Sequence, residues 1–197
     1  MVNTLNSENL INKIFTHSIL KQLIVGLFCI VFTQCNGQSN LDTTNNYSKT
    51  IKEQASVMAK ALLSKDFNTY KKFISPKISA IFGGEEKMIE QTKNGINQLE
   101  NQGTKFLNVT FGEPSNVIVV DNELQCTIPQ KSEVKISTGK LITTSTLVVV
   151  SDDNGKNWFF IDTFGKDIQF MRTNFPTLNL SDKLVIPEKP QPIVIKE

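Results

Sequence analysis

Apolar residues recur at helical spacing between residues 47 and 102. In the first of these segments they form one stripe, at intervals of three or four residues: Tyr47, Ile51, Ala55, Met58 and Leu62. Asp66 is placed to N-cap a short second helix that ends at Ser75 and Pro76, and Glu85 begins a third helix that runs to about Gln102. The pattern therefore predicts three successive helices.

From Lys105 the hydrophobic period shortens from about 3.6 residues to about 2, which is typical of β-strands. The alternation predicts strands near residues 105–111, 117–120, 124–136, 140–150 and 157–163. Pro129 interrupts the third strand and predicts a sheet edge or a bulge at that point. Helices followed by strands favour an α+β domain, with N-terminal helices packed on a curved antiparallel sheet of about four to six strands.

Residues 23–32, LIVGLFCIVF, form an uncharged apolar run that Lys21 precedes and the polar stretch TQCNGQSN follows. This layout is typical of a secretory signal peptide, and we assign residues 1–35 to it. As a helix the run would extend about 15 Å, which is about half the hydrocarbon core of a bilayer, so a permanent transmembrane helix is disfavoured. We therefore expect an exported domain that is periplasmic or associated with the outer membrane.

Cys35 follows the apolar run, at the place where the signals of bacterial lipoproteins are cleaved and the cysteine is diacylated. The preceding Phe32, Thr33 and Gln34 match that motif poorly, whereas CNGQSN resembles the processed ends of exported proteins of the Bacteroidetes. Two readings stay open. Lipidation of Cys35 would hold the domain on a membrane through its acyl chains alone, and simple cleavage near Gln38 would release it.

The rest of the chain divides into three parts. Residues 36–46 are a polar spacer, residues 47–164 carry the helix and strand patterns, and residues 165–197 form a C-terminal extension. The apolar residues of the extension gather in two runs, at 184–186 and 193–195. Such a segment is too apolar for a free linker, so we expect it to pack on the domain.

Charge and composition exclude several kinds of chemistry. The 21 basic and 19 acidic residues nearly cancel and form no basic run, so a nucleic-acid partner is not expected. Beyond Cys35 the chain has one cysteine, Cys126, which excludes an intramolecular disulfide, and its alternation with Leu124 and Ile128 favours a buried position. The only histidine, His17, lies in the expected signal peptide, which excludes hydrolases with a His base and zinc sites built on His. We expect no metal and no cofactor.

The stretch SDDNGKNW at residues 151–158 resembles the Asp box, a hairpin motif of sialidases and other propeller-type proteins that process glycans. Sialidase sites bind the substrate carboxylate with several arginines and repeat the box around a propeller. This chain has one box and one arginine, Arg172, and it is too short for several four-stranded blades. We interpret the stretch as a turn, with Asp153 hydrogen-bonded to its own loop and Trp158 packed beneath.

The segment ASVMAKALLSKDFNTYKKFISPKI, residues 55–78, resembles the opening of nuclear transport factor 2-like domains. In that family an amphipathic helix leads into an Asp-aromatic turn and a short helix. A third helix at 85–102 and a last strand with Trp and aromatic residues extend the resemblance over residues 47–164. It implies a cone whose open end forms an apolar cavity. Members use this cone for isomerisation, dehydration, ligand binding or dimerisation, so the fold does not give the function.

Members of that family often place a catalytic or pocket residue on the return strand, where this chain has Trp158, Phe160 and Asp162. Together with Tyr70 these are our candidate ligand-binding residues. An enzyme of the ketosteroid isomerase type would need a carboxylate in an apolar cavity beside a hydrogen-bond donor, and Asp162 with Tyr70 is the pair that fits best. The alternative is that Asp162 is a polar strand end and Tyr70 a core residue. We assign no catalytic residue.

Three functions from different classes follow. The one we favour is an exported, non-enzymatic envelope domain that binds a small apolar ligand or an envelope protein through its cone or sheet face. The second is a small-molecule isomerase or dehydratase that uses Asp162. The third is a structural envelope protein whose sheet forms a homodimer and whose cone is filled by its own side chains.

Overall fold

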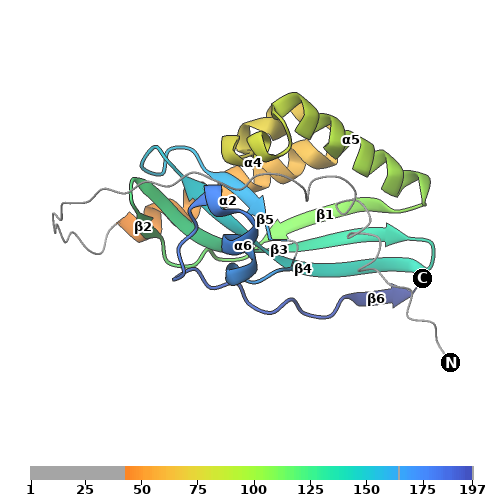
Figure 1. Cartoon of the computed structure of the whole chain (residues 1–197). Coiled ribbons are helices and arrows are strands. Elements are labelled where there is room, and N and C mark those ends of the chain that lie inside the picture. Colours follow the sequence, from red (N-terminus) through yellow and green to blue (C-terminus); the bar gives the residue numbers. More distant parts are fainter. Residues whose placement is uncertain (1–42, 164, 197) are drawn as a thin grey trace. The chain divides into compact units, whose positions relative to one another are not determined.

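The computed structural model describes residues 43–163 and 165–196, and five of its helical elements precede the first strand (Figure 1). They are α2 (Thr43–Leu63), α3 (Phe67–Tyr70), the 3₁₀ helix η1 (Lys71–Phe73), α4 (Pro76–Ile81) and α5 (Glu85–Asn101). α2 begins within the segment 36–46 that we read as a spacer. Asp66 caps α3 as predicted, because its carboxylate accepts a hydrogen bond from the backbone N–H of Thr69.

Pro76 corrects one expectation from the sequence. We expected Ser75 and Pro76 to end a helix, yet Pro76 is the first residue of α4. The Ser75 hydroxyl accepts a hydrogen bond from the N–H of Lys77. Proline is favourable at a first helical position, since its missing N–H would have no partner there. The Ser-Pro pair therefore starts a new helix shortly after η1 ends.

Within the described residues, six antiparallel strands form one curved sheet that does not close (Figure 1). They are β1 (Lys105–Phe111), β2 (Ile118–Val120), β3 (Glu123–Ile136), β4 (Gly139–Ser151), β5 (Phe159–Asp162) and β6 (Ile193–Lys196). The predicted fold class, α+β with N-terminal helices on a curved antiparallel sheet, is confirmed. The arrangement is consistent with a cone-like fold.

The centre of the sheet is the hairpin of its two long strands, β3 and β4. Its register runs from Leu124 opposite Ser151 to Ile136 opposite Gly139. Two shorter strands share each outer edge of this hairpin: β1 and β2 both pair with β3, and β5 and β6 both pair with β4. The sheet is therefore split along both edges, at residues 112–117 on one side and opposite residues 143–146 on the other.

Pro129 lies inside β3, opposite Thr146 of β4 in a regular register, so of the expected sheet edge or bulge the structure has no bulge at this residue. Its carbonyl accepts a hydrogen bond from the Gly112 N–H at 2.9 Å, which fixes the side toward which the backbone of Pro129 points. That side is the gap between β1 and β2, so the missing N–H breaks no ladder hydrogen bond. The irregularity lies in β1 instead, between Phe106 and Asn108.

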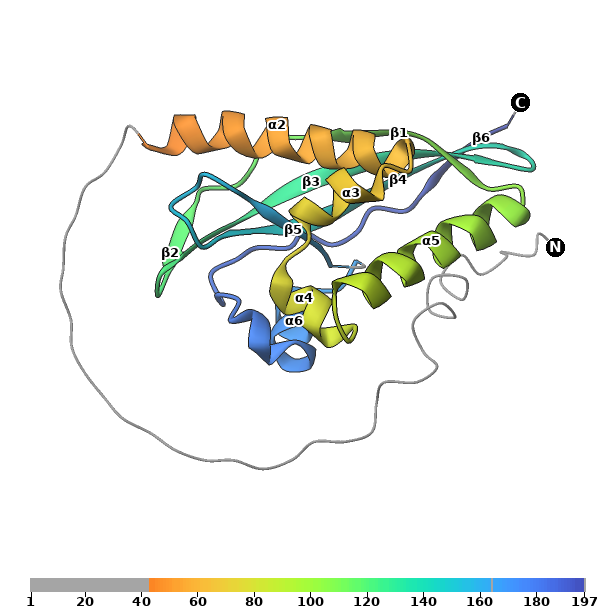
Figure 2. The ribbon, with the colours of Figure 1, turned by 90° about the horizontal axis from the view of Figure 1, so that it is seen from above.

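The two faces of the central strands carry separate apolar layers, with α2 and the C-terminal helix α6 (Ile168–Asn174) on opposite sides of the sheet (Figure 2). The layer beneath α2 consists of Ile51, Ala55, Met58, Cys126, Ile128, Leu147, Val149, Trp158 and Phe160. The layer beneath the C-terminal segment consists of Val148, Val150, Ile161, Met171, Leu178, Leu180 and Leu184. Because side chains alternate along a strand, neighbouring valines of β4 belong to different layers.

The C-terminal segment comprises α6 (Ile168–Asn174), the 3₁₀ helix η2 (Pro176–Leu178) and an extended stretch that leads to β6. Polar side chains of β3 hold the extended stretch. The buried amide of Gln125 donates to the carbonyl of Asn179 and accepts from the N–H of Ser181, each at 3.0 Å. The Thr127 hydroxyl donates to the carbonyl of Val185 at 3.3 Å. β3 therefore binds this segment through residues that alternate with those facing α2.

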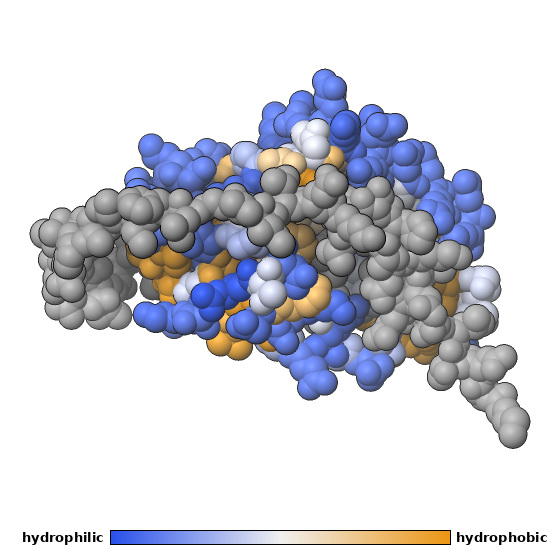
Figure 3. Space-filling model, viewed as in Figure 1, coloured by the Kyte–Doolittle hydropathy of each residue, from blue (hydrophilic) through white to orange (hydrophobic). Residues whose placement is uncertain are grey.

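α5 is less buried than α2. None of its residues is fully buried, and its outer surface is hydrophilic in the space-filling view (Figure 3). Two ion pairs link it to the preceding part of the chain, Lys65 in the turn after α2 with Glu100 at 2.7 Å and Lys71 in η1 with Glu85 at 2.8 Å. Exposed pairs of this kind contribute little stability, so half-buried apolar contacts carry most of its attachment. Among residues 43–163 and 165–196 we find no helix whose length and hydropathy would suit a membrane span.

Candidate functional site

The hairpin at residues 151–158 is closed by its own polar groups. The Asp153 carboxylate accepts hydrogen bonds from the N–H groups of Lys156 (3.1 Å) and Asn157 (2.9 Å) and from the Ser151 hydroxyl (2.9 Å). Burial acts to raise the pKa of Asp153, but the hydrogen bonds outweigh it and hold that pKa below its usual value. This carboxylate is occupied by its own loop, which is what the turn interpretation of SDDNGKNW requires.

α2 holds the hairpin against the sheet. The Gln54 amide donates to the carbonyl of Lys156 at 2.8 Å and accepts from the backbone N–H of Trp158 at 2.9 Å. Gly155 has a φ of +81°, and a Cβ built on it would lie 2.3 Å from Cε1 of Tyr47. Only glycine fits at this contact. The motif therefore serves the packing of α2 on the sheet.

Trp158 and Phe160, two of the candidate ligand-binding residues, lie in the core beneath α2. Their exposed fractions are 1% and 5%. Tyr47 meets Trp158 edge to face with ring centroids 5.7 Å apart, and Phe73 lies 6.3 Å from Phe160. The indole N–H of Trp158 finds no acceptor within the described residues. At this end the interior of the domain is filled by the chain's own aromatic side chains.

Tyr70 and Asp162 lie close enough to interact electrostatically. Burial of the phenol raises the pKa of Tyr70 to about 12, and the negative charge of Asp162 adds to this increase. Asp162 ends β5 opposite Leu147 and is exposed. The structure thus brings the predicted pair together, but the carboxylate faces solvent rather than an apolar cavity.

The sheet face that carries Asp162 also holds hydroxyl and amide groups that our reading of the sequence missed. The register places Gln130 opposite Ser145 and Ser132 opposite Thr143. Their signal in the sequence is TTST at residues 143–146, inside an otherwise apolar strand. These groups donate and accept hydrogen bonds but do not titrate near neutral pH. They are therefore not suited to proton transfer, and the Gln130 amide donates to the buried Ser132 hydroxyl at 3.4 Å.

Cys126 is fully buried, and desolvation raises the pKa of its thiol to about 12. A reactive thiolate is therefore not populated at neutral pH.

Residues 43–163 and 165–196 contain no group of three or more His, Cys, Asp or Glu side chains arranged to hold a metal ion. Cys35, the candidate for lipidation, and His17 lie outside the described residues.

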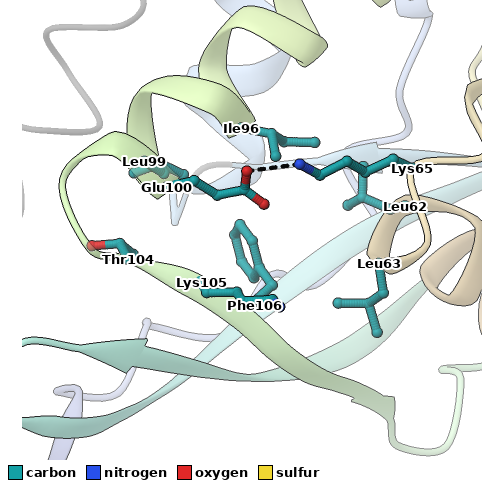
Figure 4. A pocket seen from close by; sticks show the side chains of 9 residues that line it. All are labelled: Leu62, Leu63, Lys65, Ile96, Leu99, Glu100, Thr104, Lys105 and Phe106. Atoms are coloured by element: carbon teal, nitrogen blue, oxygen red, sulfur yellow. Dashed lines mark hydrogen bonds and ion pairs between the residues drawn. The ribbon is translucent and has the colours of Figure 1, made fainter.

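Two small pockets lie among the described residues. One, of about 30 Å³, lies where α5 meets the end of α2 and the start of β1, with Phe106 beneath the ion pair of Lys65 and Glu100 (Figure 4). The other, of about 110 Å³, lies between residues 144–146 of β4 and residues 186–190 of the C-terminal segment. Sites for drug-sized ligands usually enclose about 300–1,000 Å³. Both pockets are well below that range.

The sheet register gathers lysines that are far apart in the sequence. Lys105 lies opposite Lys135 in the β1–β3 pair, and Lys135 lies opposite Lys140 in the β3–β4 pair. Lys131 lies two residues from Glu133 and four from Lys135 on the same face of β3. Glu133 forms an ion pair with Lys140 at 3.6 Å. We name Lys105, Lys131, Lys135 and Lys140 the lysine row. These lysines do not form a basic run in the sequence.

β6 forms a free edge beside the lysine row. Ile195 lies opposite Lys140, and Ile193 lies opposite Ile142. The exposed fractions of Ile193, Val194 and Ile195 are 60%, 51% and 47%. Among the described strands β6 pairs only with β4, so its outer N–H and C=O groups are open for pairing. The sheet thus ends in a short edge strand with three exposed apolar residues, which follows Pro192 and ends at Lys196.

No protein-family model and no curated protein matches the chain. Function therefore has to be inferred from its own geometry. The main features are an interior filled beneath α2, a neutral Tyr70 beside an exposed Asp162, and an apolar sheet edge beside the lysine row.

Proposed function

We propose that this chain is an exported, non-enzymatic domain of the nuclear transport factor 2-like type, held in the bacterial envelope, that binds another protein. The observation that carries the proposal is the place of its exposed apolar residues. Three in succession, Ile193 to Ile195, lie on an edge strand with an open outer side. An edge strand with exposed apolar side chains and an open outer side is where the strand of a partner can add to a sheet.

A protein partner fits better than the small apolar ligand that the sequence left open. Trp158 and Phe160, expected to line a pocket, are almost completely buried among other side chains. Neither of the two pockets described above, of about 30 and 110 Å³, has the usual volume of a site for such a ligand. The interior therefore supports the fold, and the surface is available for binding.

Site-specific photo-crosslinking in cells tests the proposal. A photoreactive amino acid replaces Val194 in β6 or, as a matched control, Val57 in α2, since the two valines are exposed to 51% and 48%. We expect a discrete protein adduct from position 194 and none from position 57. If position 194 yields no adduct, or the same adducts as position 57, protein binding at β6 is wrong.

Export and anchoring are tested by the intact mass of the protein purified from its own membrane fraction. A mass that begins at Cys35 and includes acyl chains would support a lipoprotein. A mass that begins near Gln38 without lipid would support a free exported domain. A mass that begins at Met1 would contradict export.

A second function, that of an isomerase or dehydratase, is favoured by one observation: Tyr70 and Asp162 interact. The exposure of Asp162 weighs against it, because a general base of this kind is usually tuned by burial. Assays on ketosteroids, lactones and hydroxy acids with the wild type and Asp162→Asn decide the matter. Turnover that Asp162→Asn abolishes would replace our proposal with the enzyme.

A further inference from the structure

We propose that the partner presents an acidic, extended segment, which adds to the outer side of β6 as a further strand and directs its carboxylates toward the lysine row. This inference rests on the proposed protein-binding function and specifies the chemistry of the partner. Two features carry it: the unbalanced charge of the lysine row and the open edge beside it.

The charge of the lysine row is poorly compensated by the acidic residues of its own strands. Lys105, Lys135 and Lys140 lie directly opposite one another across three neighbouring strands. Adjacent strands are about 4.8 Å apart, and like charges in opposite positions destabilise a sheet. The acidic residue on the same face of β3 as Lys131 and Lys135 is Glu133, and it forms an ion pair with Lys140 at 3.6 Å. Four lysines with one glutamate leave an excess of three positive charges, which an acidic partner would reduce.

The open edge places a partner strand within reach of these lysines. A strand added to β6 would lie about 4.8 Å beyond it and about 10 Å from β4. Lys140 and a glutamate on the added strand can span that distance across Ile195, because both side chains are long and flexible. Apolar side chains of the partner would cover Ile193 and Ile195 on the same face. The expected segment therefore alternates or mixes acidic and β-branched residues.

The rest of this chain does not supply such a segment. Outside the described residues its acidic residues are Glu8, Asp42 and Glu197, which form no run. A second copy fits less well, because pairing two β6 edges would bring together two lysine rows and both copies of Lys196. The edge of four residues is also short for a dimer, which commonly buries about 800 Å² on each partner.

Fluorescence anisotropy with labelled decapeptides tests the charge. The probes alternate Glu with Val, or Lys with Val, and are titrated with the mature protein at low and high salt. We expect the Glu-Val peptide to bind, the Lys-Val peptide not to bind, and salt to weaken binding. The double variant Lys135→Glu with Lys140→Glu should lose at least about tenfold in affinity. The control Lys60→Glu with Lys183→Glu reverses two exposed lysines outside the lysine row and should lose less than about twofold.

A peptide that alternates Glu with Gly tests strand addition, since it has the same charge but a low strand propensity. It should bind at least about tenfold more weakly than the Glu-Val peptide. Equal binding of the two would reduce the site to a polyanion surface and overturn strand addition. Thermal unfolding of each variant, followed by circular dichroism, confirms that the fold is retained.

The remaining outcomes separate this inference from the proposed function. Crosslinks at Val194 combined with Glu-Val binding that the double variant leaves unchanged would overturn the acidic partner while the protein-binding function stands. A dimer in sedimentation, with crosslinks between the β6 strands of two copies, would make a second copy the occupant. Loss of both crosslinks and peptide binding would overturn both proposals.

Discussion

Gly155 shows how one residue joins the hairpin to α2. Its φ of +81° and the 2.3 Å between a built Cβ and Cε1 of Tyr47 leave no room for a side chain. Gly155→Ala should therefore lower the free energy of unfolding by about 1–3 kcal/mol through backbone strain and overlap. Urea denaturation measures the change.

Gly95→Ala is the matched control for this prediction. Gly95 lies inside α5, and a Cβ there would meet no atom within 4 Å. Alanine is favoured over glycine in a helix by about 1 kcal/mol, so this variant should be neutral or more stable. An equal loss in both variants would show that the contact with Tyr47 is not the cause.

The titration of Tyr70 is expected to make the protein less stable at alkaline pH. Burial and the charge of Asp162 raise the pKa of Tyr70 to about 12, whereas an unfolded tyrosine titrates near about 10. Between these values the unfolded chain has lost the proton and the folded chain retains it. The free energy of unfolding should therefore fall as the pH rises from about 10 to about 12.

The variant Tyr70→Phe removes this titration. Urea unfolding at several pH values should give a shallower decline for Tyr70→Phe than for the wild type. Burial also raises the pKa of the Cys126 thiol to about 12, so Cys126 likewise lowers the free energy of unfolding as the pH rises. Because both proteins contain Cys126, its effect is the same in each. Identical slopes in the two proteins would mean that Tyr70 does not carry the effect.

Gln125 links two elements of the fold, β3 and the C-terminal segment. Its amide satisfies the carbonyl of Asn179 and the N–H of Ser181 from a fully buried position. Gln125→Ala would leave both backbone groups without this partner and should lower the free energy of unfolding by about 1–3 kcal/mol. Limited proteolysis should then cut residues 181–192 earlier than in the wild type.

Gln98→Ala, at an exposed position in α5, is the control for Gln125→Ala. We expect it to change neither the unfolding midpoint nor the proteolysis pattern, as is usual for exposed positions. Faster cleavage of the C-terminal segment in both variants would assign the effect to global rather than local loosening.

The helices and most strands could be predicted from the sequence because their patterns are local. The stripe from Tyr47 to Leu62, the cap at Asp66 and the change of period at Lys105 each depend on neighbouring residues. α4 was missed because proline before a helix reads like proline after one. For Pro129 the sequence left a sheet edge and a bulge as alternatives, because the gap between β1 and β2 that it faces does not depend on neighbouring residues.

At the scale of the whole molecule, the two apolar layers share the same central hairpin. Val148 faces the C-terminal segment and Val149 faces α2, so neither layer can be lost without exposing one side of β4. We expect one cooperative unfolding transition. Fluorescence of Trp158, the only tryptophan, reports on the α2 layer and should coincide with far-ultraviolet circular dichroism during denaturation. Separate midpoints would contradict this coupling.

Much of the candidate site also depends on the whole molecule. The pair of Tyr70 and Asp162 was expected from a family resemblance, but the exposure of the carboxylate follows from the sheet edge on which it lies. The lysine row was invisible in the sequence, because Lys105, Lys135 and Lys140 meet only through the register of three strands. Register depends on long-range pairing, which a pattern along one strand does not specify.

Because both edges of the sheet are split, its four outer strands are largely independent of one another. Each short outer strand pairs with only part of the β3–β4 hairpin, so β6 can detach while β5 keeps its register, and β2 can detach while β1 keeps its own. Fluctuations can therefore open one outer strand at a time. In evolution, one peripheral strand can be exchanged, lengthened or lost while the central hairpin preserves the other three.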